Sequence, residues 1–318
     1  MRHPITPLAL ALATLLSMQV APARAQLQPG PALTEAGVLR PLDLAVNTPY
    51  FPGRTPREGS YSFVDNAERA KYETGALVVG IAALGAKSWA WGSSHRFRVN
   101  PEGYFGRDTS SGGTDKLGHA FSSYAIDNLL TDAMYFGGSS REDAALTGAA
   151  LTLGLMTFVE VFDGYSLDHG FSKEDMFLNL TGMGFSYLRN VVPGLRDKID
   201  FRMEYKPSGH KGFRPISDYA GQRYLLAVKL AGFDALRKTP LRYVELQGGY
   251  YARGFTPAEA MPRERTAYLG IGINLGELLF GGRAASTSLY SADHLGRAFF
   301  EHVQLPGTSY RFDENTRR

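Results

Sequence analysis

The sequence predicts an α+β protein, in which a helical bundle of about four helices is followed by an antiparallel β domain. Residues 66–195 contain long stretches bounded by helix start and stop signals. From about Asp200 the pattern changes to period two. It is clearest over residues 266–275, where apolar side chains alternate with small, aromatic or polar ones, as in a half-buried strand. We therefore expect a helical domain over 66–195 and an antiparallel β domain over 196–318.

The first 25 residues are predicted to be a secretory signal peptide that does not belong to the fold. They combine a basic start at Arg2, an apolar run from Leu8 to Val20 and an Ala23-Arg24-Ala25 cleavage site. Residues 26–65 are rich in proline and glycine and show no clear period, so they are expected to form an extended N-terminal arm. The chain is therefore predicted to be exported.

Four helices are predicted within the helical domain. They run from Ala67 to Trp91, from Thr114 or Asp115 to Gly137, from after Ser140 to Asp163, and from Ser172 to Asn190. At the start of the fourth, Ser172 and Asp175 have the spacing of a capping box.

The predicted helices contain many glycines, which cost about 1 kcal/mol each relative to alanine. Glycine at this density is typical of helices whose backbones approach closely. The uncharged run 144–159 is shorter than the ~20 residues needed to span a bilayer. We therefore expect a compact bundle, soluble or seated on a membrane surface, rather than spanning helices.

Four to six antiparallel strands are predicted in the β domain. They cover residues 201–205, 224–230, 241–251 and 266–275, with a weaker pattern over 299–303. The final residues, Asp313–Arg318, are interpreted as a charged tail.

Charge and cysteine content exclude some classes of protein. The formal net charge of +3 includes Arg2 and Arg24, so the mature chain carries about +1, and no nucleic-acid partner is expected. The sequence contains no cysteine although export would permit disulfides.

Asp115 and His119 form the first candidate site. They are four residues apart on one helix, so their side chains meet on one face, whereas Lys116 is expected to point elsewhere. An imidazole held by a carboxylate can act as a base or as a metal ligand. Alternatively, Asp115 is only a first-turn acid and His119 bonds a neighbouring helix.

Two further helices carry polar residues in apolar surroundings. Glu160 and Asp163 lie on one face of the third helix and would repel each other unless a cation or a proton lies between them. Their simpler interpretation is that they solvate the helix end. On the fourth helix Asp175 is explained by capping, but Asn179 in mid-helix is not.

Taken together, these residues are candidates for a divalent metal site, because oxygen ligands with one imidazole suit a hard or borderline ion. The metal candidates are Asp115, His119, Glu160, Asp163, Asp175 and Asn179, and the catalytic candidates are His119, Asp115 and Glu160. No established di-metal, zinc-protease, nucleophile-elbow or phosphate-loop motif is present.

Several ordered motifs resemble the YfiM-like predicted periplasmic lipoproteins, a domain of unknown function. They are Gly103-Tyr104-Phe105-Gly106, the run from Gly112 to His119 with Ser123-Tyr124, the run from Glu160 to Tyr165, and Gly170 to Ser172 with Asp175, Asn179 and Gly182. Asp115-Lys116-x-x-His119 is also similar, more weakly, to VanZ-like membrane proteins. The C-terminal part is similar to the β-rich extension of longer members. The resemblance implies a location in the Gram-negative envelope but no established activity, and this chain departs from it by lacking a cysteine for lipidation.

Two functions fit these observations. The first is a periplasmic or outer-membrane-associated structural or binding protein, whose buried polar cluster fixes the register of the helices. The alternative is a metal- or histidine-dependent hydrolase acting on a lipid head group or an envelope glycan. The expected partners are a membrane surface or envelope components, and the sequence indicates no oligomeric state.

Overall fold

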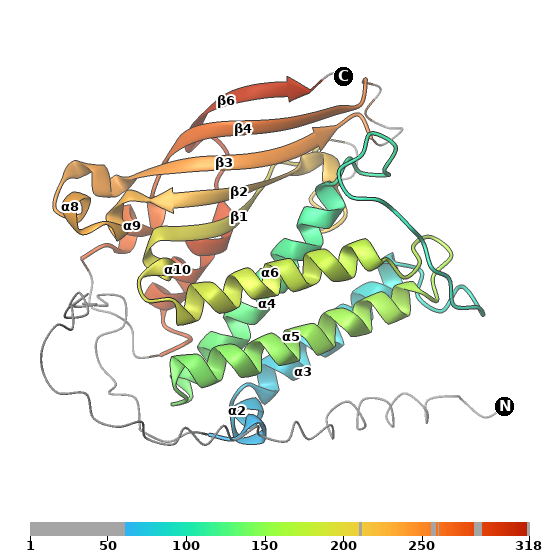
Figure 1. The fold of residues 1–318 in the computed structure, drawn as a ribbon, viewed down its shortest axis with the longest axis horizontal. Helices are drawn as coiled ribbons and strands as arrows, with labels where there is room; N and C mark the ends of the chain where they lie inside the picture. The colour runs from blue at the N-terminus through green and yellow to red at the C-terminus, as the bar shows by residue number, and fades with distance from the viewer. Residues whose placement is uncertain (1–60, 210–211, 256–258, 260, 283–287, 317–318) are drawn as a thin grey trace, which may run out of the picture. The chain divides into compact units, whose positions relative to one another are not determined.

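The computed structural model describes residues 61–316 apart from 210–211, 256–258, 260 and 283–287. The predicted signal peptide and most of the predicted arm lie outside these residues. The α+β prediction is confirmed, because long helices precede a mostly antiparallel six-stranded sheet (Figure 1). The helices before the sheet are α2 (Phe63–Arg69), α3 (Lys71–Ser88), α4 (Thr114–Phe136), α5 (Arg141–Asp163) and α6 (Lys173–Val191). A further helix, α10 (Ala292–His302), lies between β4 and β5 in the chain.

The limits of α4, α5 and α6 agree with the prediction to within two residues. The serines at the N-termini of α5 and α6 explain two of these limits. The Ser140 side chain accepts a hydrogen bond from the Asp143 backbone N–H at 3.0 Å, and Ser172 accepts one from Asp175 at 3.2 Å. Local capping chemistry is readable from sequence, which is why these limits were predictable.

The first predicted helix differs from the structure. It begins at Phe63, inside the predicted arm, because Ser62 and Asp65 form a capping box. It is interrupted at Ala70, which has a φ of −112°, and α3 ends at Ser88 rather than at Trp91.

Two glycines show the close helix packing that the composition suggested. A Cβ on Gly182 of α6 would lie 1.8 Å from the Ala120 carbonyl oxygen of α4, so only glycine allows this crossing. A Cβ on Gly148 of α5 would meet Thr131 of α4 at 2.7 Å. The same explanation is wrong for four other helical glycines, which face open space: Gly75, Gly80, Gly154 and Gly184.

The six strands are β1 (Ile199–Tyr205), β2 (Gln222–Lys229), β3 (Val244–Arg253), β4 (Glu264–Ile273), β5 (Val303–Gln304) and β6 (Ser309–Thr316), in the order β5-β1-β2-β3-β4-β6. All neighbours are antiparallel except β1 and β5. The short helices are α7 (Leu195–Lys198), α8 (Asp234–Arg237), α9 (Leu275–Phe280), η1 (Tyr219–Gly221), η2 (Leu230–Gly232) and η3 (Pro240–Tyr243).

Three strand predictions were wrong in part. Residues 299–302 belong to α10, whose apolar and polar residues separate onto two faces of a helix. Residues 241–243 form a 3₁₀ turn before β3, and residues 313–316 of the predicted tail pair with β4 as part of β6. In the last case backbone pairing with β4 overrides the charged composition.

The helices and the sheet share an aromatic core next to β1. Tyr124 of α4 is fully buried, and its ring lies 5.7 Å from that of Phe201 in β1. Leu178 of α6 and Tyr224 of β2 pack in the same cluster. This core fixes α4 and α6 against the sheet and thereby positions the polar groups at the start of α4.

The sheet buries its polar face and exposes much of its apolar face. In β4 the buried positions include Thr266 and Tyr268, whereas Leu269 is 70% exposed and Ile271 48% exposed. Neighbouring strands follow the same rule. The buried polar face carries Asp200, Arg202, Glu204, Glu245, Gln247 and Thr266, and the exposed apolar face carries Leu226, Leu246, Leu269, Ile271, Ile273, Tyr310 and Phe312. The alternation was predictable, but not which side is buried.

Curvature of the sheet explains how its polar face is covered. Arg311 of β6 forms an ion pair with Glu204 of β1, although three strands lie between them. Gly249 lies on the same face, and a Cβ there would meet the Tyr268 ring at 2.4 Å. The polar face is therefore concave, and its charged groups find partners across the curve.

Among the described residues, α5 is the one helix whose length and composition would allow it to cross a membrane. Half of its apolar stretch is buried within the protein, and the core helix of a globular protein meets the same criterion.

Candidate functional site

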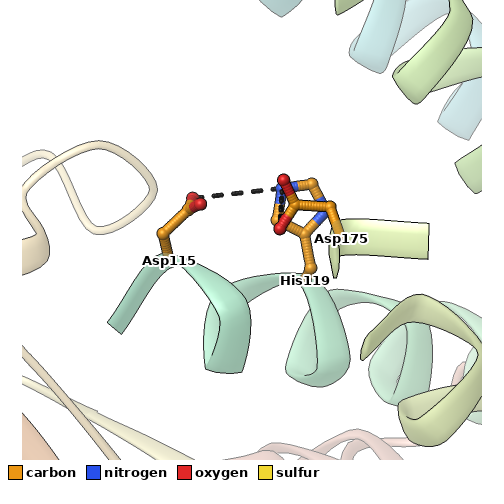
Figure 2. A group of neighbouring side chains, drawn as sticks. All are labelled: Asp115, His119 and Asp175. Carbon is orange, nitrogen blue, oxygen red and sulfur yellow. Dashed lines mark ion pairs between the residues drawn. The ribbon is translucent and has the colours of Figure 1, made fainter. Parts of the chain in front are cut away.

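Asp115 and His119 of α4 and Asp175 of α6 come together at one end of the helices (Figure 2). Each offers one ligand atom, and the three atoms lie within 4.8 Å of one another. His119 Nε2 is 3.9 Å from Asp115 Oδ1 and 3.8 Å from Asp175 Oδ1. We call these three residues the acid–histidine cluster. The sequence predicted the pairing of Asp115 with His119, and the helix crossing adds Asp175.

The other nitrogen of His119 is held by two residues from different helices. Nδ1 lies 3.3 Å from Glu160 Oε1 of α5 and 3.3 Å from Asn179 Oδ1 of α6. Asn179 Oδ1 also accepts a hydrogen bond from Ser123 at 3.0 Å. Glu160 and Asn179 are each 1% exposed. These contacts fix the ring so that Nε2 faces the two aspartates.

Lys116 does not point away from the cluster, as the sequence suggested. Its Nζ lies 3.0 Å from Asp115 Oδ2 and 2.7 Å from Asp175 Oδ1, and it also pairs with Glu102 in the loop before α4. The helical position directs its Cβ elsewhere, but four methylenes let the ammonium fold back among the acids. Lys116 is 2% exposed, so its ammonium is shielded from water, whereas Asp115 and Glu102 remain partly exposed.

Two candidate residues have contacts that the sequence did not foresee. Asp163 accepts a hydrogen bond from Trp91 Nε1 at 2.6 Å, so it anchors the segment after α3 rather than joining the acid–histidine cluster. The backbone N–H of Asp175 donates the capping hydrogen bond to the Ser172 hydroxyl. The Asp175 carboxylate takes no part in this bond and instead contacts Lys116 and His119. The capping explanation of the Asp175 side chain is therefore wrong.

Burial and neighbouring charges act in opposite directions on the pKa values of Asp115 and His119. Burial would raise the pKa of Asp115, but His119, Lys116 and a hydrogen bond with Tyr219 outweigh it and lower the pKa to about 2. Burial would lower the pKa of His119, but Asp175, Asp115 and Glu160 raise it to about 9. Burial, with Asp175 and Asp163 nearby, raises the pKa of Glu160 to about 8. At neutral pH the metal-free cluster therefore contains a cationic imidazole beside a neutral Glu160.

A family comparison falls on the same residues. Residues 101–191 match the family described as predicted periplasmic lipoprotein (DUF2279). This DUF2279 segment contains the acid–histidine cluster together with Glu102, Lys116, Glu160 and Asn179, and it leaves out Tyr219 and the whole sheet. No curated protein and no solved structure matches the chain. The family has no assigned activity, and its periplasmic description agrees with the export predicted from sequence.

The DUF2279 segment also contributes most of a cavity of about 230 Å³ beside the cluster. Its polar end includes Asp115, His119 and Asp175, with His169 and Asp163 close by. Its wall includes apolar side chains from α3, α4 and α5 together with Met203 of β1. The arrangement therefore offers a fixed imidazole and two carboxylates to a ligand that enters an otherwise apolar cavity.

Sequence reasoning missed Glu102, Lys116 and Tyr219. Glu102 and Tyr219 lie in segments without a period, where no pattern predicts the direction of a side chain. For Lys116 the available signal was its long, positively charged side chain directly after the acid Asp115.

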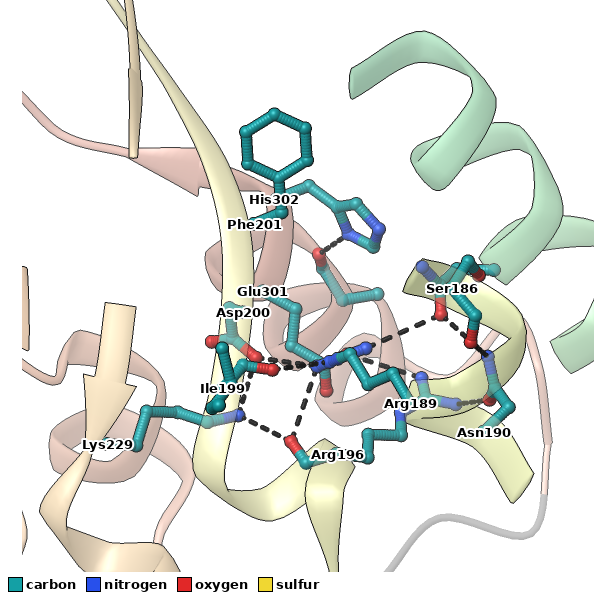
Figure 3. A network of polar contacts seen from close by, with 12 residues as sticks. Ser186, Arg189, Asn190, Arg196, Ile199, Asp200, Phe201, Lys229, Glu301 and His302 are labelled. Atoms are coloured by element: carbon teal, nitrogen blue, oxygen red, sulfur yellow. Dashed lines mark hydrogen bonds and ion pairs between the residues drawn. The ribbon is translucent and has the colours of Figure 1, made fainter. Parts of the chain in front are cut away.

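A second buried polar network joins the helices to the sheet (Figure 3). The Arg189 side chain of α6 is 0% exposed and contacts Asp200 of β1 at 2.6 Å and Glu301 of α10 at 3.1 Å. Lys229 of β2 also pairs with Asp200, at 2.6 Å. None of these residues was a sequence candidate, because their partners lie far apart along the chain.

The stability of the metal-free protein should fall as the pH rises from 6.5 to about 9. His119 has an ordinary pKa of 6.5 and a folded pKa of about 9. Its stabilising contribution is thus complete below 6.5 and is lost as the pH passes through 9. Glu160, with a folded pKa of about 8 against an ordinary 4.5, acts in the same direction up to pH 8. Urea unfolding in the presence of a chelator would measure this slope.

His119→Gln should remove much of the fall in the free energy of unfolding between pH 6.5 and 9, as measured by the same urea unfolding. An unchanged slope in this variant would show that other groups cause it.

Proposed function

We propose that this chain is an exported envelope hydrolase in which Asp115, His119 and Asp175 hold a divalent metal ion. The observation that carries the proposal is the orientation of the His119 ring. Its Nδ1 is held by Glu160 and Asn179, while its Nε2 faces two carboxylate oxygens at 3.8–3.9 Å. Ligand atoms around a tetrahedral zinc ion lie roughly 3.4 Å apart, given bonds of about 2.1 Å. A small inward movement would therefore complete the ligand set.

The donor set supports hydrolytic chemistry. Three protein ligands leave a coordination position open, and a divalent ion there would activate water or polarise an ester or phosphoester oxygen. Glu160 is 1% exposed and touches the imidazole, so it would orient the ring rather than contact substrate. The substrate would be a lipid head group or an envelope glycan that enters the cavity beside the cluster.

Metal analysis tests the proposal directly. Protein purified without chelators should contain about one equivalent of a divalent ion, or bind one in a titration with Zn²⁺ or Mn²⁺. His119→Ala should abolish this binding, whereas His95→Ala, at an exposed position, should keep it. A folded wild-type protein that neither contains nor binds a divalent ion would refute the metal centre.

A second function is favoured by Lys116. An ammonium among three carboxylates already neutralises much of their charge and links the 102 loop, α4 and α6. In that case the cluster is structural and fixes helix register, and the protein is a binding or scaffolding component of the envelope. Removal of the Lys116 charge separates the two accounts, because only a metal centre would then bind a divalent ion more tightly.

We also propose that the exposed apolar face of the sheet seats the protein on the outer membrane. Supporting this, the centre of the face carries the apolar side chains of Leu226, Leu246, Leu269 and Ile271, and on β4 a charged residue, Arg265, lies on this face only at the start of the strand. An apolar face of this kind is typical of a contact surface. A lipid surface fits it better than a polar partner would, because the centre of the face, around Leu246, Leu269 and Ile271, offers no ion-pairing groups.

Vesicle flotation tests this placement. The wild-type protein should float with phosphatidylethanolamine–phosphatidylglycerol vesicles, and Leu269→Glu should weaken this association by about tenfold through loss of apolar burial. Leu167→Glu, at a similarly exposed loop position, is the matched control and should float normally. Wild-type protein that stays in the soluble fraction would refute the placement.

A further inference from the structure

The cavity beside the acid–histidine cluster changes from polar to apolar along its length. On α4, His119, Ser122 and Ile126 line it in succession, one helical stripe of seven residues. On α5, Asp163, Val159 and Met156 line it over the same span. Because α4 and α5 are antiparallel neighbours, and His119 lies beside Glu160, both stripes become apolar in the same direction.

The cavity lining along α4, from His119 to Ile126, has the length of a short hydrocarbon chain. Seven residues of helix extend about 10 Å. Ile81 and Leu84 of α3 close the wall opposite these stripes. An uncharged wall next to a charged end is the lining that an amphiphile with one chain would fill.

We infer that this cavity binds a single acyl chain of a phosphate-headed amphiphile, with the phosphate at the acid–histidine cluster. The position of the acyl chain follows from the apolar wall alone. The choice of a phosphate head rests on the proposed function. The carboxylates of Asp115, Asp175 and Glu102 outnumber the two basic groups among them, Lys116 and His119, and would repel a phosphate unless a divalent ion is bound there. The open coordination position of that ion would accept a phosphate oxygen.

Binding of alkyl phosphates of increasing length tests the inference. Trp89 lines the cavity, and the sequence contains two tryptophans, so intrinsic fluorescence reports on occupancy. Chains of 6 to 14 carbons are added below their micelle concentrations, with Zn²⁺ and separately with a chelator. With Zn²⁺, affinity should rise about fourfold per methylene and level off once the 10 Å wall is filled. Affinity that does not depend on chain length would overturn the inference.

Cavity-filling variants separate this site from nonspecific apolar binding. Leu84→Phe should weaken binding of the longer chains by about fifteenfold, the loss of roughly two buried methylenes. Val79→Phe on the exposed face of the same helix is the control and should bind like wild type. Val159→Phe provides a second wall variant if Leu84→Phe does not fold. Equal binding by the wall variants and the control would refute the site.

The head group is tested with alkyl trimethylammonium ions of the same lengths. Chain-length dependence that persists in chelator, without any metal binding, would retain the acyl site and refute the proposed metal centre. Metal binding without chain-length dependence would retain the metal centre and refute the acyl site. Preference for the trimethylammonium series in the presence of Zn²⁺ would overturn the phosphate head.

Discussion

Replacing Lys116 with methionine should lower the free energy of unfolding by about 3–5 kcal/mol in metal-free protein. The change keeps the length and the apolar stem of the side chain but removes its charge. Asp115, Asp175 and Glu102 then remain close together without their shared cation. The pKa of Asp115 is expected to rise most, because Lys116 is one of the charges that hold it near 2. Chemical denaturation at pH 7 would measure the loss.

The same variant separates the two proposed functions. If the cluster is a metal centre, Lys116→Met removes a competing cation, so affinity for a divalent ion should rise and added metal should restore stability. If the cluster is only structural, metal should restore nothing. Lys173→Met, at the exposed first residue of α6, is the matched control and should change stability by less than about 0.5 kcal/mol. Equal stability of Lys116→Met and the control would contradict both accounts.

Replacing Arg189 with methionine should have a similarly large effect, a loss of about 3–5 kcal/mol. The guanidinium donates to the Ile199 carbonyl at 2.6 Å, to Asp200 at 2.6 Å and to Glu301 at 3.1 Å. Lys229 still neutralises Asp200 in the variant, but Glu301 and the Ile199 carbonyl lose a buried partner. Thermal and urea unfolding would both report the change.

Arg237→Met is the control for this prediction. Arg237 is partly exposed and pairs at 3.5 Å with the exposed Asp234, a surface contact that contributes ~0–1 kcal/mol. Because Arg189 joins α6 to β1 and α10, its removal should also make the helices and the sheet unfold separately. A single cooperative transition with unchanged midpoint would contradict the role assigned to Arg189.

Local chemistry made much of the helical part predictable. Ser140 and Ser172 cap their helices through hydrogen bonds to residues three positions ahead, so the sequence contains the whole interaction. The pairing of Asp115 with His119 follows from helical spacing alone in the same way. Strand alternation over residues 266–273 was likewise evident, because side chains in a strand point to opposite faces in turn.

Contacts between distant segments account for what was missed. Asp163 bonds Trp91, which is 72 residues away, and no spacing rule connects them. The tail residues 313–316 became a strand because β4 offered an unpaired edge. Arg189 and Glu301 are 112 residues apart, and their pairing depends on how α10 returns to β1.

By itself the sequence determined the α+β class, the limits of three long helices, an expected export and the acid–histidine pair on α4. Only the tertiary structure brought Asp175, Glu160 and Asn179 around His119, folded Lys116 among the acids and turned the polar face of the sheet inward. The first group depends on interactions within a few residues, which sequence spacing fixes. The second depends on helix crossings and sheet curvature, which are set by packing over the whole domain, such as the contact between Gly182 and Ala120.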